Sequence, residues 1–339
     1  MKRSIEVLVV ATLAAAAPPA QRKPGSPLDH LPPNVRQLTW FGERADFSPD
    51  NKSVAFMGKS FGDAFVIDLA EGHIRCLTCS IPAAPFLRVM HIANGDYVLI
   101  GPETFKDIRT SRRQDNELWY LSRQPGSRPV RFGQKMSEGI ALSKKNLRIS
   151  YSETHAQNPD LAEGASRLTV ADIDLNGPAP RLVNKKVVYS SPSNACTIEA
   201  QDFFDKDTKM TFTCYEPKGL ASVMTIDLAS GAVENMSKAP GTYNECEGII
   251  PGGKYTLVEG DRQIAQLGGT HGSRQIDIWK LKLDGSGKDF VRLTHFNDYE
   301  GWKASNPVVS TDGKLMAFQV AHAADEAGVG YGIMLYRLE

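Results

Sequence analysis

One pattern recurs six times along this chain: an apolar strand, a tight polar turn and a second apolar strand. It is clearest near the two ends, at residues 47–56 and 309–318. Weaker copies lie at residues 93–98, 142–147, 205–210 and 250–255. Asp-Asn, Asp-Gly and Asn-Gly at these turns predict hairpins, because tight hairpin turns need residues that accept positive φ. A repeat of roughly 45–60 residues with several strands predicts a β-propeller with one blade per copy.

A third strand follows each hairpin, and its copies lie at residues 64–69, 118–121, 168–173, 223–228, 276–281 and 332–337. A fourth strand follows at residues 74–78 in the first copy and at residues 290–294 in the fifth. The sixth copy has no fourth strand, but residues 35–39 carry the same pattern ahead of the first copy. We therefore expect an all-β, six-bladed ring in which residues 35–39 complete the last blade, which removes both free sheet edges.

The repeats also carry a family resemblance. The Ser-Pro-Asp-Asn-Lys turn at residues 48–52, with the apolar strand after it, resembles the PD40 repeats of TolB-like propellers. The fourth strands that end in Leu-Thr are similar to those repeats as well. The resemblance covers about residues 35–339 and implies a six-bladed β-propeller fold.

The N-terminus is typical of a secreted protein. Lys2 and Arg3 precede an apolar run at residues 8–17, which is too short to cross a bilayer. The sequence thus predicts a signal peptide at residues 1–20, a loose Pro-rich leader at 21–34 and the propeller at 35–339. The expected location is the secretory pathway or the outside of the cell (the periplasm in a bacterium), with no membrane association.

Charge composition excludes one class of partner. Lys and Arg together number 39, Asp and Glu number 39, and no long basic run is present. Nucleic-acid binding needs clustered basic residues, so a nucleic acid is not an expected partner. A small molecule is expected instead, and the sequence carries no signal for the oligomeric state.

Five cysteines fit an oxidising compartment. Cys76 and Cys79 have redox-type spacing but lie at a strand end, so a structural disulfide or buried thiols are expected there. Cys196 can pair with Cys214 or with Cys246, and one cysteine stays unpaired. The triplets that begin at residues 51 and 235 are N-glycosylation sequons, which predict a glycoprotein.

Two sets of loops meet on one face of a propeller: those that lead into each first strand, and those that join second to third strands. Polar side chains are frequent at the first-strand positions, which are Glu43, Arg44, Arg88, His91, Glu138, Glu199, Gln201, Asn244, Glu245, Glu247, Lys303, Ser305 and Asn306. Carboxylates from four blades come close to one axis there, and like charges raise one another's pKa. Such carboxylates suit an acid catalyst or a cation site.

The loops between second and third strands differ in length and carry most of the remaining candidates. The blade-two loop is basic, with Arg112 and Arg113, and the blade-five loop runs from Glu259 to Arg274. We expect three loop histidines, His155, His271 and His322, on the same face as Glu138, Glu247 and Asn306. Long loops on a rigid scaffold are common places for function.

Three histidines with a carboxylate or Gln would suit manganese or zinc, and a pectin-fragment lyase family has such a site on a propeller. No closely spaced histidine pair is present, so the expectation is that no metal or cofactor is used. A Gly-x-Ser-x-Gly nucleophile motif is absent too, which argues against a propeller-capped peptidase.

The leading hypothesis is a metal-free enzyme that acts on a small organic molecule. The chain is similar in size, blade count and leader to the fungal hetero-Diels–Alderases of tropolone–sesquiterpenoid biosynthesis. That resemblance implies a cyclase or lyase-type reaction of specialised metabolism, in which a quinone methide forms by loss of water. The expected catalytic residues are Glu259, Arg262, His271 and His322. The expected substrate-binding residues are Arg88, His155, Glu247, Lys303, Asn306 and Gln319.

Two alternatives stay open. One is a TolB-like envelope propeller that recruits a protein or glycan partner. TolB-like proteins carry an N-terminal domain, whereas only about fifteen residues separate the signal segment from the ring here, which counts against this alternative. The other is a metal-dependent oligosaccharide lyase.

Overall fold

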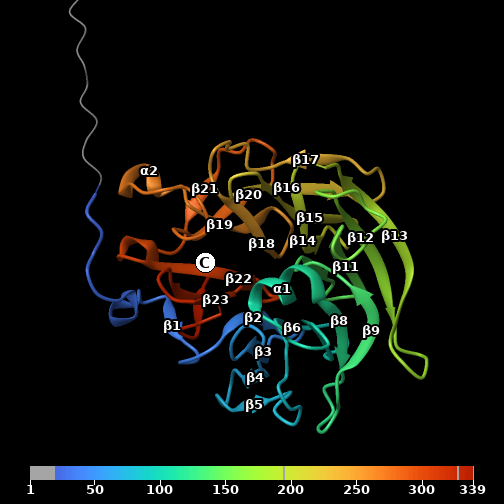
Figure 1. Ribbon diagram of the computed structural model, residues 1–339. Coiled ribbons are helices and arrows are strands. Elements are labelled where there is room, and N and C mark those ends of the chain that lie inside the picture. Colours follow the sequence, from blue (N-terminus) through green and yellow to red (C-terminus); the bar gives the residue numbers. More distant parts are fainter. Residues whose placement is uncertain (1–19, 194, 327, 339) are drawn as a thin grey trace, which may run out of the picture.

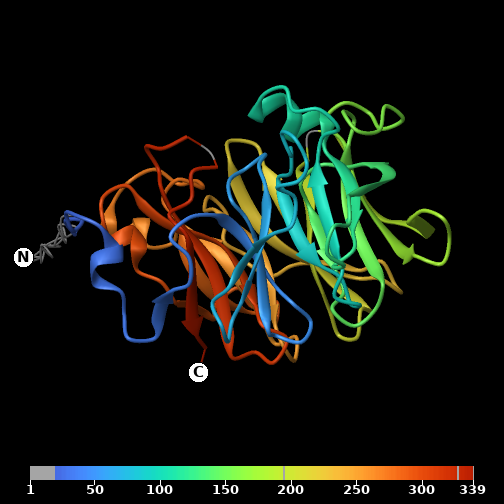
Figure 2. The same cartoon turned by 90° about the horizontal axis from the view of Figure 1, so that it is seen from below.

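A computed structural model describes residues 20–193, 195–326 and 328–338. All but the last residue of the expected signal peptide lie outside the described residues. Six four-stranded antiparallel sheets form a ring, as Figures 1 and 2 show. The expected all-β, six-bladed propeller is confirmed. No helix among the described residues is long and apolar enough to cross a membrane.

The strands follow the chain from the inside of each blade to its outside. Blade one consists of β2 (Glu43–Phe47), β3 (Ser53–Met57), β4 (Ala64–Asp68) and β5 (Ile74–Cys76). Blade two consists of β6 (Arg88–His91), β7 (Tyr97–Gly101), β8 (Glu117–Leu121) and β9 (Val130–Lys135). Blade three consists of β10 (Ile140–Leu142), β11 (Arg148–Thr154), β12 (Ser166–Asp174) and β13 (Arg181–Ser191). The first strands of neighbouring blades contact one another, which identifies them as the inner strands.

Blades four to six repeat this order. Blade four consists of β14 (Thr197–Phe204), β15 (Lys209–Glu216), β16 (Leu220–Asp227) and β17 (Val233–Asn235). Blade five consists of β18 (Asn244–Ile250), β19 (Tyr255–Gly260), β20 (Asp277–Lys282) and β21 (Phe290–Arg292). Blade six consists of β22 (Trp302–Val309), β23 (Leu315–His322), β24 (Ile333–Arg337) and β1 (Val35–Gln37). Short helical turns interrupt the loops: Pro27–His30, α1 (Ile108–Thr110), Ser111–Asp115, α2 (Ile264–Leu267) and Phe296–Asp298.

The ring closes through the N-terminal strand, as expected. Strand β1 pairs antiparallel with β24, and the register places Val35 opposite Tyr336 and Gln37 opposite Met334. The Thr39 hydroxyl extends the contact, because it accepts a hydrogen bond of 2.9 Å from the Ile333 N–H. The last blade therefore has its outer edge paired rather than free.

The leader is packed against the ring, so the expectation that it is loose is wrong. The Arg22 guanidinium donates 2.7 Å to Gln275 Oε1, and Lys23 forms a parallel bridge with Tyr299. Leu28 and Leu31 pack against the apolar core of blade six. The prediction of a loose leader rested on its proline-rich composition alone. Such a segment can still pack against the ring when apolar side chains are interspersed among the prolines.

The apolar core lies between successive blades. Its largest fully buried side chains include Phe47, Phe56, Phe86, Phe212 and Phe318, which lie on the inner two strands of their blades or just before them. Burial of one such side chain contributes about 1.5–3 kcal/mol to folding. Inner strands such as β2 and β7 are buried at every position, because each packs against a neighbouring blade on both faces, and the short apolar runs of the repeat reflect this.

Side chains of one blade also hydrogen-bond the inner strand of the next. The donors and acceptors are Arg44 N to Gln319 Oε1, His91 N to Asp46 Oδ2, Ala200 N to Ser152 Oγ, Cys246 N to Thr213 Oγ1, and Asn306 N to a Glu259 oxygen. The inner edges of the sheets would otherwise leave backbone N–H groups unpaired. Gln319 and Glu259, which were expected to bind substrate and to catalyse, thus also join blades.

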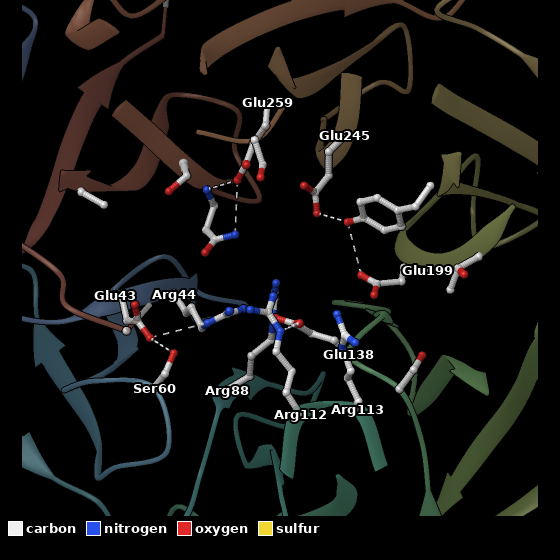
Figure 3. A pocket seen from close by; sticks show the side chains of 18 of the residues that line it. Glu43, Arg44, Ser60, Arg88, Arg112, Arg113, Glu138, Glu199, Glu245 and Glu259 are labelled. Atoms are coloured by element: carbon white, nitrogen blue, oxygen red, sulfur yellow. Dashed lines mark hydrogen bonds and ion pairs between the residues drawn. The ribbon is translucent and has the colours of Figure 1, made fainter. Parts of the chain in front are cut away.

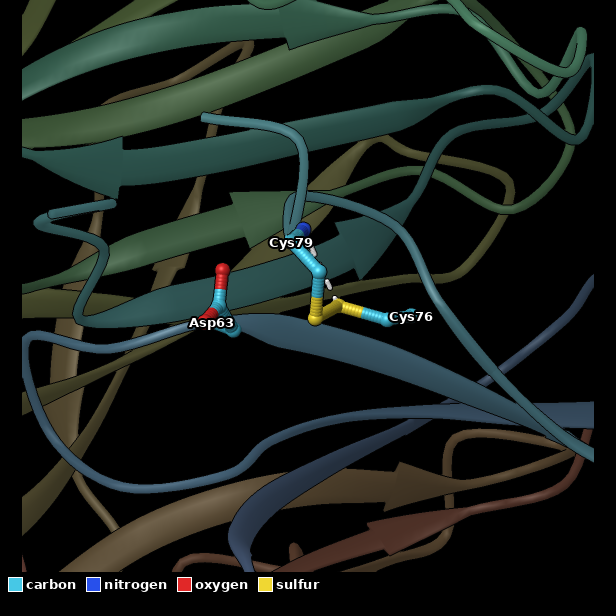
Figure 4. Close-up of side chains that lie close together, drawn as sticks. All are labelled: Asp63, Cys76 and Cys79. Atoms are coloured by element: carbon cyan, nitrogen blue, oxygen red, sulfur yellow. Dashed lines mark hydrogen bonds between the residues drawn. A yellow bond between two sulfur atoms is a disulfide. The ribbon is translucent and has the colours of Figure 1, made fainter. Parts of the chain in front are cut away.

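Two disulfides cross-link the chain. Cys76 pairs with Cys79 beside Asp63, as Figure 4 shows, and Cys196 pairs with Cys214. Cys246 stays a buried thiol, which decides between the two pairings that the sequence left open. Two disulfides are consistent with an oxidising, extracellular compartment.

Candidate functional site

A cavity of about 970 Å³ opens at one end of the central channel, on the face where the sequence placed the functional loops. Every blade contributes an ionisable side chain to its lining. These are Glu43 and Arg44, Arg88 with Arg112 and Arg113, Glu138, Glu199, Glu245 and Glu259, and Lys303. Figure 3 shows these groups, apart from Lys303, converging from their blades around the axis. The lining is thus polar and charged, which suits a small polar ligand.

Irregularities in the inner strands help to form this lining. The pairing of first and second strands shifts register at residues 43–46, 200–202, 246–249 and 305–308. Arg44 and Asn306 lie at two of these shifts, in the left-handed region, with φ of 55° and 48°. A bulge redirects the side chains of a strand. Arg44 and Asn306 both line the cavity.

One wall of the cavity is basic and is centred on Glu138. Arg44 Nη1 lies 2.6 Å from Glu138 Oε1, and Arg112 Nε donates to the other carboxylate oxygen. Glu138 is 7% exposed. Burial alone would favour its neutral form, but the charges of Arg112, Arg44 and Arg88 hold the pKa of Glu138 well below its ordinary value. Glu138 is therefore an ionised carboxylate.

Two further guanidinium groups, those of Arg88 and Arg113, line this wall. Figure 3 places Arg88 beside Arg112 and Arg44. Among the described residues, Arg88 Nε is buried without a hydrogen-bond partner. Arg113 comes from the same helical turn as Arg112, and the Asp107 side chain caps the start of that segment through the Thr110 N–H at 2.8 Å. The basic loop of blade two thus builds much of the wall.

The opposite wall is built from carboxyl groups and phenols. The hydroxyls of Tyr215 and Tyr243 both donate to the Glu245 carboxylate, one to each oxygen. Burial and then the charges of Glu138 and Glu245 raise the pKa of Glu199 from 4.5 to about 8. Burial and then the charge of Glu245 raise the pKa of Glu259 to about 7. Glu199 is therefore a neutral acid at neutral pH.

A glycine permits the close approach of Glu138 and Glu199. A Cβ atom on Gly139 would lie 2.5 Å from the Glu199 Cα atom, which is too close for any other residue without a backbone shift. The first strand of blade four can therefore pack directly against the segment that carries Glu138. This contact brings an ionised and a neutral carboxyl group to one cavity.

The structure brings most of the expected site residues together. Seven of the ten line the cavity: Glu259, His322, Arg88, His155, Lys303, Asn306 and Gln319. Glu247 does not line it, but its carboxylate lies within 4.8 Å of the carboxylates of Glu245 and Glu259. His155 and His322 share this face with Glu138 and Asn306, as expected.

Arg262 and His271 do not line the cavity. The Arg262 guanidinium stacks over the Phe290 ring at 3.9 Å, and burial lowers its pKa. His271 Nδ1 lies 2.9 Å from the buried Asp261 carboxylate. The end of the blade-five loop reaches the cavity through Ser273 and Arg274, whereas the side chains of Arg262 and His271 contact their own blade.

The three loop histidines do not form a metal site with one another. His155 Nδ1 lies 2.6 Å from the Leu161 carbonyl, whereas the His322 ring packs edge-on against Trp302. Within the described residues, the clusters of ligand-type side chains are Asp63 with the two disulfide cysteines, and a group of three glutamates. Cysteines joined in a disulfide do not ligate a metal.

Sequence reasoning missed the phenols of the site. Tyr215 ends the second strand of blade four and Tyr243 precedes the first strand of blade five, so both lie at the positions that build this face. Glu138, Glu199 and Glu245 were assigned to the channel mouth but not to the site. The shared signal was a polar residue at the first-strand position of successive blades, and it pointed to this cavity more reliably than the longest loops did.

No family model matches the sequence, and no curated protein matches it. Several solved structures share its fold. A gluconolactonase from Xanthomonas campestris is 10% identical with a TM-score of 0.55, and the match covers 90% of this chain and 89% of that one. An oligogalacturonate lyase in complex with manganese is 10% identical with a TM-score of 0.50, over 88% and 78%. A putative TolB from Agrobacterium tumefaciens is 14% identical with a TM-score of 0.46, over 84% and 71%. The chain therefore shares the β-propeller fold of the gluconolactonase and of the lyase.

Proposed function

We propose that this protein is an enzyme that acts on a small anionic organic molecule in the charged cavity, with Glu199 as the proton donor. The observation that carries the proposal is a neutral carboxyl group that shares one cavity with a wall of guanidinium groups. Catalytic acids need a pKa near the working pH, and a pKa of about 8 meets that requirement. The leader and the disulfides support work in the secretory pathway.

The basic wall would hold the anionic part of the substrate. Arg88 and Arg112 present planar guanidinium groups, which bind paired oxygen atoms well. A tropolonate ring carries two adjacent oxygens that share one negative charge, so it matches such a pair of donors. Glu138 keeps the arginines in place and offsets part of their charge.

The reaction that fits best is loss of water followed by ring closure. Glu199 donates its proton to a hydroxymethyl oxygen of the bound anion, and the carbon–oxygen bond breaks. The electron pair of the anionic ring oxygen moves into the ring, which gives a neutral quinone methide and one water molecule. Glu199 is left as a carboxylate and regains a proton from solvent. The quinone methide then adds to an alkene, a step that needs only proximity and orientation.

The test separates binding from proton transfer. Tropolone itself is the binding probe, and a hydroxymethyl tropolone with an alkene trap is the substrate for the rate measurement. We expect Arg88→Met and Arg112→Met to weaken tropolone binding about tenfold or more, because each removes a charge-assisted contact. We expect Glu199→Gln to bind tropolone normally and to slow water loss about 100-fold or more.

The outcomes are distinct for each rival explanation. A wild-type protein that neither binds tropolone nor exceeds the uncatalysed rate contradicts the proposal. Binding without any rate enhancement would identify a binding propeller instead of an enzyme. Lys185→Met, which removes an exposed cation outside the cavity, serves as the charge-matched control and should change neither binding nor rate.

A further inference from the structure

Three glutamates of blade five lie together at the channel and are not used by the proposed reaction. Oxygens of Glu245, Glu247 and Glu259 lie within 4.8 Å of one another. Glu245 and Glu247 lie two residues apart on β18, and Glu259 lies opposite Glu245 on β19. The antiparallel register and the bulge at residues 246–249 therefore bring the three side chains together. Glu245 and Glu259 face the cavity.

Two unpartnered oxygens accompany this cluster. Glu247 is 5% exposed, and its Oε1 atom has no hydrogen-bond partner among the described residues. Ser305 is 4% exposed and lines the same cavity, and its Oγ atom is unpartnered as well. Ser305 directly precedes Asn306, whose N–H and side-chain amide both donate to Glu259. A buried oxygen without a partner is unfavourable, so these atoms are expected to have a ligand.

We propose that Glu245, Glu247 and Glu259 bind a calcium ion, with the Ser305 hydroxyl and water completing the oxygen ligands. All these donors are oxygens, which hard cations prefer and which zinc or copper do not. Oxygens that lie within 4.8 Å of one another fit opposite sides of an ion with Ca–O distances of about 2.4 Å. Magnesium needs a tighter octahedron at about 2.0–2.1 Å and is expected to bind more weakly.

The charges of the cluster support this assignment. The three carboxylates have oxygens within 4.8 Å of one another and repel one another, and a divalent cation would reverse that repulsion.

The site uses other side chains than the proposed reaction, although the charge of Glu245 also contributes to the raised pKa of Glu199. The calcium ion would join two strands of blade five within the acidic wall, on residues that neither donate the proton nor hold the anion. The ion would stabilise the fold because it binds the folded chain. Calcium at about 100 times its dissociation constant should raise the Tm by about 5 °C.

The experiment is a titration of the full chain after treatment with EDTA. Calorimetry with calcium chloride measures the affinity and the stoichiometry of binding. Melting curves with calcium, magnesium or manganese chloride give the order of preference. We expect one calcium per chain and a smaller effect of magnesium.

Variants locate the site. Glu247→Gln and Glu259→Gln should each weaken calcium binding tenfold or more, and Glu247→Gln should keep the calcium-free Tm because glutamine has nearly the same shape and volume as glutamate. Glu199→Gln, in the same cavity but outside the cluster, should bind calcium as the wild type does. No heat and no Tm change at 5 mM calcium, or unchanged binding in both cluster variants, would overturn the proposal. Stronger binding of magnesium or manganese would overturn the choice of calcium.

The calcium proposal can fail separately from the proposed reaction, because Glu247→Gln and Glu259→Gln test calcium binding whereas Glu199→Gln tests proton donation. Loss of calcium binding with normal water loss, or the reverse, would separate the two proposals.

Discussion

The neutral acid at Glu199 predicts an unusual dependence of stability on pH. Burial and the charges of Glu138 and Glu245 raise the pKa of Glu199 from 4.5 to about 8. A group whose pKa is raised by folding stabilises the folded protein fully below its unfolded pKa, and that stability is lost as the pH rises through the folded pKa. Glu199 should therefore make the protein progressively less stable between pH 4.5 and about 8.

The size of the effect follows from the same two values. The difference between 4.5 and about 8 corresponds to at most ~5 kcal/mol of unfolding free energy. The Glu199 side chain is partly exposed to the cavity, so solvent screening reduces this to about 2 kcal/mol. Glutamine keeps the neutral shape and cannot ionise. We expect Glu199→Gln to equal the wild type at pH 5 and to be more stable by about 2 kcal/mol at pH 9.

Denaturation by guanidinium chloride, followed by tryptophan fluorescence at pH 5, 7 and 9, measures this difference as a shift in midpoint. Glu138→Gln is the matched control, because Glu138 lies in the same cavity but is ionised. That variant removes the charge that faces Arg44 and Arg112 and should lose about 3 kcal/mol at pH 7, although Arg44 keeps its contact with Glu43. If Glu199→Gln were less stable than the wild type at pH 9, folding would lower the pKa of Glu199 instead of raising it, Glu199 would already be ionised at neutral pH, and its role as proton donor would fail.

Three further predictions concern the scaffold. A chain that begins at residue 40 lacks β1 and exposes the edge of β24. Its Tm should fall by more than 5 °C, and size-exclusion chromatography should detect association. A chain that begins at residue 20 is the control and should behave as the full chain does. The double variant Cys196→Ser, Cys214→Ser removes a disulfide of sequence separation 18 and should lose about 3 kcal/mol of unfolding free energy. An unchanged denaturation midpoint would show that this disulfide does not stabilise the fold. Arg262→Ala removes the contact with the Phe290 ring, so it should lower the Tm by a few degrees and leave tropolone binding unchanged. Weakened tropolone binding with a normal Tm would instead show that Arg262 contacts the ligand.

The fold was predictable because it depends on local, repeated chemistry. Each blade needs hairpin turns and strands with alternating apolar residues, and both are written in contiguous segments such as residues 47–56 and 309–318. The closure by residues 35–37 was predictable for the same reason, since the last copy lacked one strand and the first residues of the ring supplied its pattern. Composition alone misjudged the leader, because docking depends on which apolar surface of the ring is near.

The site needed the tertiary structure, because its chemistry comes from residues that are far apart in the sequence. Polar positions at the start of each blade placed Arg88, Asn306 and Lys303 at the cavity correctly, since the repeat fixes which end of a strand faces the axis. Loop length and composition did not show that Arg262 and His271 turn back onto blade five. Whether Glu138 is ionised and Glu199 neutral depends on three arginines, a bulge and the space left by Gly139, and only the folded ring brings these together.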